Sequence, residues 1–166
     1  PAGEKLTIRT ASSFISPEQA AINFNREVAD ADVQLISGKA REQWNNYLGR
    51  VEAEGGTDEQ LRTFYSCLYR TLLFPREFYE FDSQGNPVYY SPYDGNVHDG
   101  YMYTDNGFWD TFRAVHPLFT LLYPEVSERV TQSIINAYNE SGFMPEWASP
   151  GHRGCMIGNN SVSLLV

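Results

Sequence analysis

The chain opens with an alternating pattern that is typical of a β-strand. In the stretch "KLTIRTASSFI", single polar residues separate the apolar Leu6 and Ile8, and this period of two predicts a strand at residues 6–10. A strand needs a partner to complete its hydrogen bonds, and no partner segment is visible in the neighbouring sequence.

A helical pattern follows directly. Ser16 is placed as an N-cap, Pro17 as the first helical residue and Gln19 as the capping-box residue. Apolar residues then recur every three or four positions, which predicts one helix with a buried face that ends at Gly38. The predicted buried face consists of Ala20, Phe24, Val28, Ala31 and Leu35. The predicted exposed face carries Asn23, Arg26, Glu27 and Asp30.

Helical spacing returns four more times along the chain. A short segment surrounds Trp44, Leu48 and Val51. A helix with the capping box Thr57 and Gln60 runs until Pro75. Residues 108–122 form a third pattern, which Pro117 should kink or divide. A fourth helix starts at Pro124 and ends at Gly142, with one apolar face made of Val126, Val130, Ile134 and Tyr138.

Two turn-rich stretches interrupt these helices. Residues 76–106 are rich in Tyr, Asp, Gly, Asn and Pro, and "PVYYS" indicates a short hairpin within them. A loop of this length inside a compact domain is usually functional, which makes it a candidate wall of a binding site. Residues 143–161 are irregular, and "SVSLLV" resembles the opening turn of another helix. A lone strand at one end and an unfinished helix at the other predict a fragment of a larger protein.

Composition narrows the class of protein. The net charge is −9, the sequence pI is near 4.7 and Lys and Arg do not cluster, so binding to nucleic acid is disfavoured. No apolar run approaches the roughly 18 residues of a membrane span, and the first ten residues lack the features of a signal peptide. The two cysteines, Cys67 and Cys155, match neither a disulfide framework nor a metal motif.

The stretch "GFWDTFRAVHP" holds the first candidate for chemistry. Asp110 and Arg113 are three residues apart, so on a helix they share one face, with Trp109 and Phe112 beside them. One interpretation is an exposed ion pair worth less than about 1 kcal/mol. The other is a polar clamp for a sugar, in which the carboxylate and guanidinium bind hydroxyls and an aromatic ring covers the C–H surface.

Other candidates have plain structural explanations beside functional ones. Glu146 in "PEWASPGH" is either an acid or ligand contact, or a solvated loop carboxylate. The three histidines are too scattered in sequence to nominate a transition-metal site; they are His98, His116 and His152. The oxygen-rich "GNNS" (residues 158–161) suits a hard cation or sugar hydroxyls, but also a helix N-cap. Ser66 and Cys67 lie in an amphipathic helix without a nearby base, which argues against a nucleophile.

Four segments in order give the chain a strong family resemblance. They are "TASSFISPEQAAINFNRE", "WNNYLGRVEAEGGTDEQLRTFYSCLYRTLLFPREF", "YTDNGFWDTFRAVHPLFTLLYPE" and "SGFMPEWASPGHRGCMIGNNSVSLL". Together they resemble the glycoside hydrolase family 92 α-mannosidases from about Ile8 to the last residue. F-Y-S-x-L-Y-R, W-D-T-F-R-A-x-H-P-L and C-M-I-G are the most distinctive parts of the likeness.

The resemblance implies a two-domain protein, of which this chain is the junction. Family members join an N-terminal β-sandwich to a C-terminal (α/α)6 barrel. On this basis residues 1–15 are the end of the sandwich with its last strand, residues 16–56 are linker helices, and residues 57–166 are the first helices of an incomplete barrel. The fold class is therefore mainly α.

The resemblance also implies an activity. Family members are exo-acting enzymes that remove terminal α-linked mannose, mostly α-1,2-linked mannose of N-glycans, with inversion and with a bound calcium ion. Inversion needs room for a water, so the acid and base carboxylates stand roughly 6.5 to 9.5 Å apart. The family's general acid Glu and general base Asp belong to motifs expected beyond Val166, so this chain alone should be inactive. The location implied is secreted, periplasmic or cell-surface.

The site residues implied are substrate-binding ones. Asp110 and Arg113 match the family residues that hold mannose hydroxyls, Trp109 matches a neighbouring wall, and Glu146 and His152 are further candidates in the predicted loop. The segment "SPGHRGCMIGNNS" departs from the commoner family pattern at four positions, which are His152, Arg153, Asn159 and Asn160. Because these loops are expected to shape the far side of the site, the linkage cleaved stays open.

Two other functions fit the residues. A non-catalytic carbohydrate-binding protein of helical architecture would use Asp110, Arg113 and the Tyr-rich loop without an acid and a base. Another (α/α)6 glycosidase would need glucose or phosphate contacts that the sequence does not reveal. For the α-mannosidase, the expected partners are an α-mannoside oligosaccharide and the remainder of the same polypeptide.

Overall fold

A computed structural model describes residue 3 and residues 6–165, and this part of the chain is mainly helical. Its helices are α1 (Pro17–Glu27), α2 (Val33–Leu48), α3 (Asp58–Thr71), α4 (Phe108–Thr111), α5 (Val115–Leu122) and α6 (Pro124–Ser141), and a short 3-10 helix, η1, spans Asn160–Leu164. Its strands are β1 (Arg76–Glu77), β2 (Glu80–Phe81), β3 (Pro87–Tyr90), β4 (Val97–Asp99), β5 (Tyr103–Thr104), β6 (Asn106–Gly107) and β7 (Trp147–Ala148).

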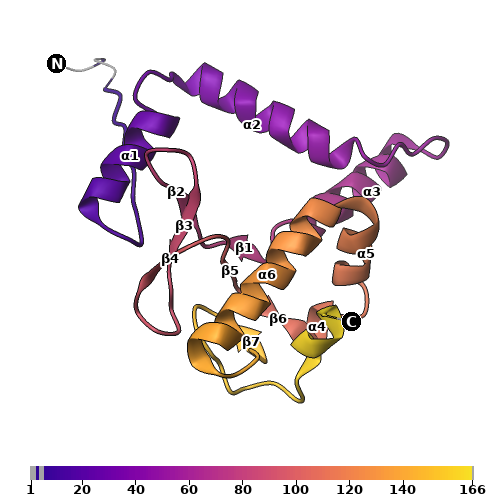
Figure 1. Cartoon of the computed structure of the whole chain (residues 1–166). Coiled ribbons are helices and arrows are strands. Elements are labelled where there is room, and N and C mark those ends of the chain that lie inside the picture. The colour runs from indigo at the N-terminus through magenta and orange to yellow at the C-terminus, as the bar shows by residue number, and fades with distance from the viewer. Residues whose placement is uncertain (1–2, 4–5, 166) are drawn as a thin grey trace.

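The helices and strands form two groups joined by one long helix. α1 lies beside the strands β2, β3 and β4, whereas α3, α5 and α6 gather on the other side, and α2 spans the distance between them (Figure 1). None of the described helices combines the length and apolar composition that a membrane crossing requires.

The strand predicted at residues 6–10 does not form. This segment has no regular secondary structure, and Leu6 and Ile8 are 84% and 75% exposed. The physical reason is that an isolated strand leaves its backbone N–H and C=O groups unpaired, and the described residues supply no neighbouring strand for it. Assignment of residues 1–15 to a β-sandwich remains a prediction, and part of that range lies outside the described residues.

The single helix predicted up to Gly38 is instead two helices. α1 starts as predicted, with Ser16 accepting a hydrogen bond from the Gln19 backbone N–H, but it ends at Glu27. The Asp32 side chain then accepts a hydrogen bond of 2.7 Å from the Leu35 backbone N–H and caps a new helix, in which Gly38 is an interior residue. The short segment predicted around Trp44 is the last part of this same α2.

The buried side of α1 is polar rather than apolar. Asn23, expected in solvent, is buried and donates to Glu80 Oε2 at 2.6 Å and to the Ser12 carbonyl at 2.9 Å. Gln19 is also buried and donates to the Phe81 carbonyl at 2.7 Å. These bonds attach α1 to β2, and they explain why amides face inward, because buried polar groups are stable when hydrogen-bonded.

The second helix start is confirmed in detail. Thr57 accepts from the Gln60 backbone N–H, and the Gln60 side chain accepts from the Thr57 backbone N–H, which completes a capping box at α3. α3 ends at Thr71, shortly before Pro75, as the pattern predicts.

Residues 76–106 form small antiparallel sheets rather than an unstructured loop. β2, β3 and β4 make a three-stranded sheet that includes the hairpin predicted at "PVYYS", with Tyr89 opposite His98. β1 pairs with β5, and β6 pairs with β7, which comes from the second turn-rich stretch. The β6–β7 pair places Gly107 opposite Trp147, and so joins the two predicted loops.

The helical pattern at residues 108–122 is divided, but not at Pro117. The break falls at residues 112–114, between α4 and α5, and Pro117 lies within the first turn of α5. A proline is tolerated there because the N–H groups of a first helical turn have no partner within the helix.

α6 supplies the centre of the core. Val130 and Ile134 are buried as predicted and pack with Tyr103 and Phe108. Tyr138, assigned to the same face, is 48% exposed, whereas Ser133 and Ala137 are buried in its place. The helix ends at Gly142, whose φ of 79° is the left-handed conformation expected of a C-terminal glycine.

We expect Asp32→Ala to lower the free energy of unfolding by about 1 kcal/mol, because it removes the cap of α2. Urea denaturation followed by circular dichroism measures the change. Asp30→Ala is the matched control, since Asp30 is exposed in the preceding turn and caps no helix. Equal effects of the two substitutions would contradict the assignment of Asp32 as the cap.

Candidate functional site

The short helix α4 presents the main candidate residues to solvent. Its first residue, Phe108, is 2% exposed and packs against α6, so the next residues turn outward. Trp109 is 41% exposed, and Asp110 and Arg113 are also exposed. One buried aromatic side chain therefore decides which face of this turn is available to a ligand.

Asp110 lies close to Gly107 and Trp147. A Cβ atom built on Gly107 would come within 2.8 Å of Asp110 Oδ2 and 3.6 Å of the Trp147 ring. The absence of a side chain at residue 107 therefore leaves room near this glycine for both the Asp110 carboxylate and the Trp147 ring. Trp147 was missed by the sequence analysis, although its neighbour Glu146 was noted, because only the β6–β7 pairing brings it to Asp110.

Arg113 does not pair with Asp110. Both residues are within the described part of the chain, and no ion pair or hydrogen bond joins them. Arg113 Nη1 instead donates to the Trp109 carbonyl at 2.9 Å, and its guanidinium lies 4.4 Å from the centre of the Phe112 ring and 5.2 Å from that of Trp109. The exposed ion pair is thus not the arrangement adopted, and the Asp110 carboxylate is available to accept hydrogen bonds.

A buried polar network lies beneath α4. Asn106 Nδ2 and His116 Nε2 are 3.1 Å apart, and the Thr111 hydroxyl lies 3.0 Å from both Asn106 Oδ1 and the Gly107 carbonyl. Burial lowers the pKa of His116 to about 4, so the imidazole is neutral near pH 7 and its Nε2 accepts from the Asn106 amide. His116 is therefore a structural histidine, and the network holds β6, α4 and α5 together.

The other two predicted site residues have separate surroundings. Glu146 is half-buried and directly precedes Trp147 in β7. His152 Nε2 lies 2.8 Å from the Ser141 hydroxyl, and its ring meets Tyr93 edge-on at 4.8 Å between centres. Partial burial lowers the pKa of His152. The structure therefore brings Asp110 next to Trp147, while the contacts of His152 are with the end of α6 and the β3–β4 turn.

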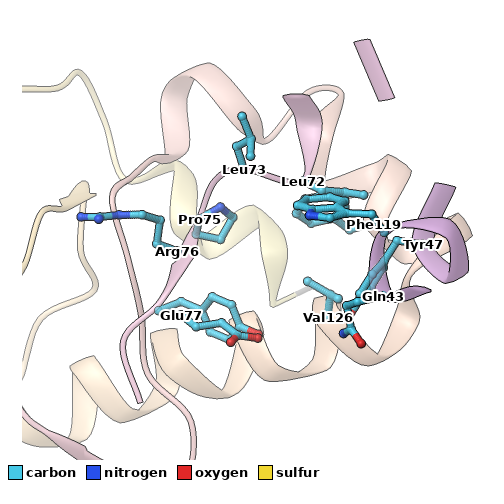
Figure 2. Close-up of a pocket in the computed structure, with 11 residues that line it drawn as sticks. Gln43, Tyr47, Leu72, Leu73, Pro75, Arg76, Glu77, Phe119 and Val126 are labelled. Carbon is cyan, nitrogen blue, oxygen red and sulfur yellow. The ribbon is translucent and has the colours of Figure 1, made fainter. Parts of the chain in front are cut away.

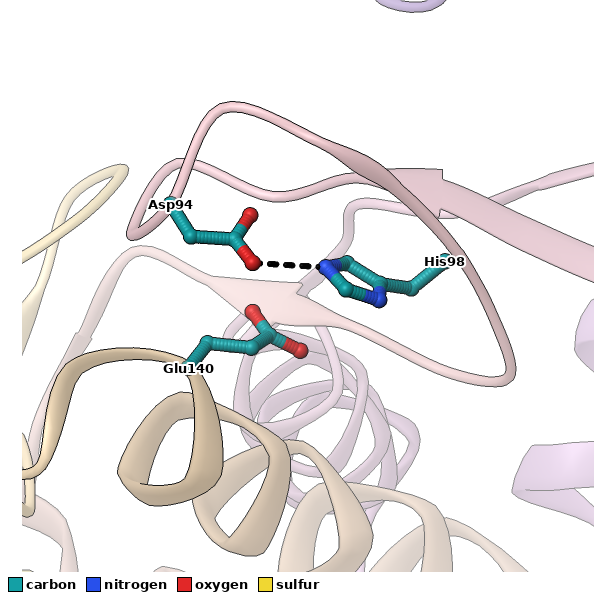
Figure 3. Close-up of side chains that lie close together, drawn as sticks. All are labelled: Asp94, His98 and Glu140. Carbon is teal, nitrogen blue, oxygen red and sulfur yellow. Dashed lines mark hydrogen bonds and ion pairs between the residues drawn. The ribbon is translucent and has the colours of Figure 1, made fainter.

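Two of the remaining loop carboxylates belong to ion pairs. Asp105 pairs with Arg76, and Asp94 Oδ2 lies 2.9 Å from His98 Nε2. Glu140 from α6 approaches the second pair, and the ligand atoms of Asp94, His98 and Glu140 all lie within 4.8 Å of one another (Figure 3). The histidines looked too scattered for a metal site in sequence, but folding places one of them between two carboxylates.

Two clusters among the described residues, at Glu140 and in "GNNS", do not match the calcium ion that the resemblance implies. Calcium takes six to eight oxygen ligands, whereas the cluster around Glu140 includes an imidazole. In "GNNS", Asn159 Oδ1 accepts from the Ser161 hydroxyl at 2.6 Å, and Asn160 donates to the Ile157 carbonyl at 2.8 Å. Asn159 takes the N-cap position of η1, but its side chain caps no backbone N–H.

A separate hollow of about 390 Å³ lies between α2, the end of α3, α5 and α6. Its walls are mostly apolar, with Tyr47, Leu72, Pro75 and Phe119 among them (Figure 2). None of the predicted site residues lines it, so its position does not coincide with the candidate chemistry on α4.

Comparison with known proteins assigns the chain to a family. Residues 19–166 match the glycosyl hydrolase family 92 catalytic domain, so the chain belongs to that family. The GH92 α-mannosidase BT3965 from Bacteroides thetaiotaomicron superposes with a TM-score of 0.80 at 30% sequence identity, over 92% of this chain and 21% of that one. A second structure of that enzyme, in complex with mannoimidazole, gives the same TM-score and identity over 20% of its chain.

Two further relatives agree with this assignment. The GH92 family glycosyl hydrolase ccman5 superposes with a TM-score of 0.72 at 26% identity, over 92% of this chain and 21% of that one. An uncharacterized secreted glycosidase from Arthroderma benhamiae is 28% identical over 78 residues, which are 45% of this chain and 10% of the relative. The chain thus spans about a fifth of the length of the structural relatives.

We expect His116 to make stability depend on pH. Because its folded pKa of about 4 is below the ordinary value near 6.5, the unfolded state binds more protons between these values. The contribution of His116 to the free energy of unfolding is therefore complete above pH 6.5. Roughly 3 kcal/mol of that free energy is lost as the pH falls to 4. Denaturant unfolding at several pH values should show a shallower dependence for His116→Gln, and parallel curves would contradict the assignment.

Proposed function

We propose that the complete protein hydrolyses terminal α-linked mannose and that this chain supplies part of its substrate-binding surface. Membership of the glycosyl hydrolase family 92 supports the reaction class. The α-mannosidase structure with bound mannoimidazole supports a mannoside as the substrate. The non-catalytic carbohydrate-binding protein is the alternative against which the experiments below are designed.

The observation that carries this proposal is the Asp110 carboxylate near Trp147, which has no ion-pair or hydrogen-bond partner among the described residues, with Arg113 exposed close by. A carboxylate accepts hydrogen bonds from two neighbouring hydroxyls, and a guanidinium donates to a third oxygen. An indole ring offers an apolar face to the C–H groups of a pyranose. Asp110 therefore serves as a substrate-holding group, and Trp109 or Trp147 as the wall.

The finer features of the proposal rest on the resemblance. The enzyme is exo-acting and inverting, with a preference for α-1,2-linked mannose of N-glycans. The general acid Glu and the general base Asp belong to other parts of the complete protein, as do the ligands of the calcium ion. Glu146 and His152 bind more distant parts of the substrate. A location outside the cytoplasm is supported by the fungal relative, which is described as secreted.

We expect Asp110→Asn in the complete protein to lower kcat/KM for an aryl α-mannoside by roughly 10- to 100-fold. The substitution keeps the shape of the side chain and removes the charge from hydrogen bonds worth about 1.5–3 kcal/mol. Steady-state kinetics measure the loss, and circular dichroism verifies the fold.

Asp30→Asn is the matched control, because it removes the same charge from an exposed turn far along the chain from α4. An unchanged kcat/KM for Asp110→Asn would contradict the role of Asp110. Mannoside binding by the wild-type protein without any turnover would favour the carbohydrate-binding alternative.

We expect Gly107→Ala to raise KM about tenfold while changing the free energy of unfolding by less than about 1 kcal/mol. The new Cβ meets the Asp110 carboxylate, which is the movable end of a side chain, so the carboxylate is displaced and the fold is kept. Gly38→Ala is the matched control, because Gly38 lies in α2 and a Cβ at that position meets nothing within 4 Å. An unchanged KM for Gly107→Ala would contradict this placement of Asp110.

A further inference from the structure

The residues Asp94, His98 and Glu140, named here the hairpin cluster, come from three different elements. Asp94 lies in the turn after β3, His98 in β4 and Glu140 near the end of α6. Figure 3 shows the Glu140 carboxylate pointing toward the Asp94–His98 pair. The three side chains share the boundary between the hairpin and α6, so a group bound among them would connect the two.

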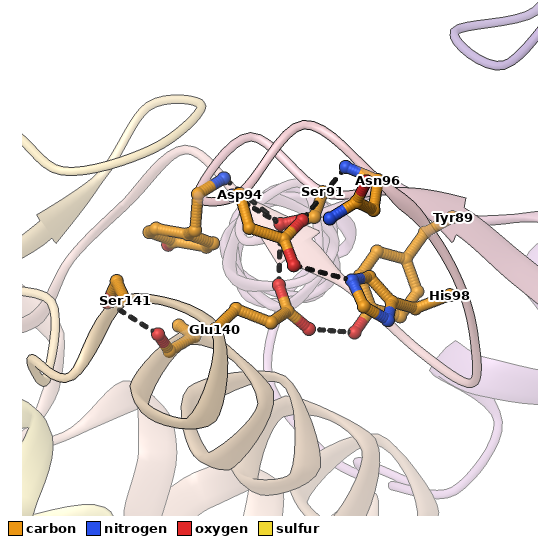
Figure 4. Close-up of polar contacts among 9 residues, drawn as sticks. Tyr89, Ser91, Asp94, Asn96, His98, Glu140 and Ser141 are labelled. Atoms are coloured by element: carbon orange, nitrogen blue, oxygen red, sulfur yellow. Dashed lines mark hydrogen bonds and ion pairs between the residues drawn. The ribbon is translucent and has the colours of Figure 1, made fainter.

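Two buried hydroxyl groups orient Glu140 toward this point. Tyr89 and Ser91 are 2% and 0% exposed. The Tyr89 hydroxyl donates to Glu140 Oε1, and the Ser91 hydroxyl donates to Oε2 at 2.6 Å (Figure 4). Each carboxylate oxygen receives one hydrogen bond here and keeps a lone pair, which is how protein groups commonly position a carboxylate that binds a metal.

The backbone also positions Asp94. Its Oδ1 accepts a hydrogen bond of 2.8 Å from the Asn96 backbone N–H. The other carboxylate oxygen, Oδ2, faces His98. The hairpin cluster therefore offers one oxygen from Asp94, one nitrogen from His98 and the Glu140 carboxylate.

The hollow beside the hairpin cluster is acidic. A hollow of about 390 Å³ opens onto it and is lined by seven residues of the described chain, which are Tyr89, Asp94, His98, Asp99, Asn136, Asn139 and Glu140. Three of these residues are acidic, and no Lys or Arg is among them. A bound cation would supply the missing positive charge, and the Asp99 and Asn side chains at the hollow provide further oxygen atoms.

The distances suit a single small ion. Zinc binds imidazole nitrogen and carboxylate oxygen at about 2.0–2.2 Å, so two neighbouring ligand atoms stand roughly 3 Å apart. Asp94 Oδ2 and His98 Nε2 are 2.9 Å apart, and one ligand atom from each of the three residues lies within 4.8 Å of the other two, so a slight closing of the side chains brings all three onto one ion. Imidazole favours zinc and related transition metals over calcium or magnesium.

We propose that Asp94, His98 and Glu140 bind one divalent transition-metal ion, of which Zn²⁺ is the test case, and that the ion fastens the β3–β4 hairpin to α6. On binding, His98 Nε2 loses its contact with Asp94 and ligates the ion, and water or an oxygen from the hollow completes the coordination. None of its ligands belongs to the α4 surface on which the proposed mannoside chemistry rests.

The test uses the complete natural protein after treatment with EDTA. Competition titration with Zn²⁺ counts the ions bound by the wild-type protein and by His98→Ala and Glu140→Gln, with circular dichroism to verify folding. We expect each variant to bind one Zn²⁺ fewer than the wild type. Tyr89→Phe removes only the tyrosine hydrogen bond that orients Glu140. It should lower the affinity for this one Zn²⁺ ion by about 10- to 100-fold.

Glu128→Gln is the control for Glu140→Gln, because it removes an exposed carboxylate from the same helix. His152→Ala is the control for His98→Ala, and neither control should change the number of ions. Anomalous diffraction at the zinc edge from wild-type crystals gives an answer that does not depend on the variants folding. A peak among the three side chains supports the site, and its absence at saturating Zn²⁺ overturns it, as does an unchanged stoichiometry in folded His98→Ala.

Discussion

The burial of Phe108 against α6 is the contact on which the candidate binding surface depends. Phe108 is the first residue of α4 and packs with Val130 and Ile134. Because successive residues of a helical turn point in different directions, fixing this ring inward directs Trp109 and Asp110 outward. Apolar burial of one large side chain, worth about 1.5–3 kcal/mol, thereby orients the neighbouring polar residues.

Polar contacts then remove the freedom that apolar packing leaves. The Asn106, Thr111 and His116 network is buried beneath α4, where unsatisfied groups would be costly, so it is stable only with its hydrogen bonds complete. The pairing of β6 with β7 adds Trp147 from a distant part of the chain. Apolar packing, the buried polar network and the β6–β7 pairing therefore all fix the position of α4.

α6 connects this surface to the hairpin cluster. Its middle packs against Phe108, its Ser133 hydroxyl accepts from the Tyr103 backbone N–H at 2.8 Å, and near its end Glu140 meets the hydroxyls of Tyr89 and Ser91. One helix thus organises two chemically different groups of side chains (Figure 1).

The local sequence by itself determined where α3 and α6 begin and end. The Thr57 capping box and the Gly142 C-cap involve residues three or four positions apart, so their signals are complete within one turn. Apolar periodicity gave the wrong prediction near Asp32. The apolar spacing continues across this residue and suggests one helix, but the Asp32 side chain caps the start of a second helix. The tertiary structure alone decided that Trp147 lies beside Asp110 and that Glu140 lies beside His98. Those contacts join residues about 40 positions apart, and their formation depends on strand pairing and core packing, which no local pattern encodes.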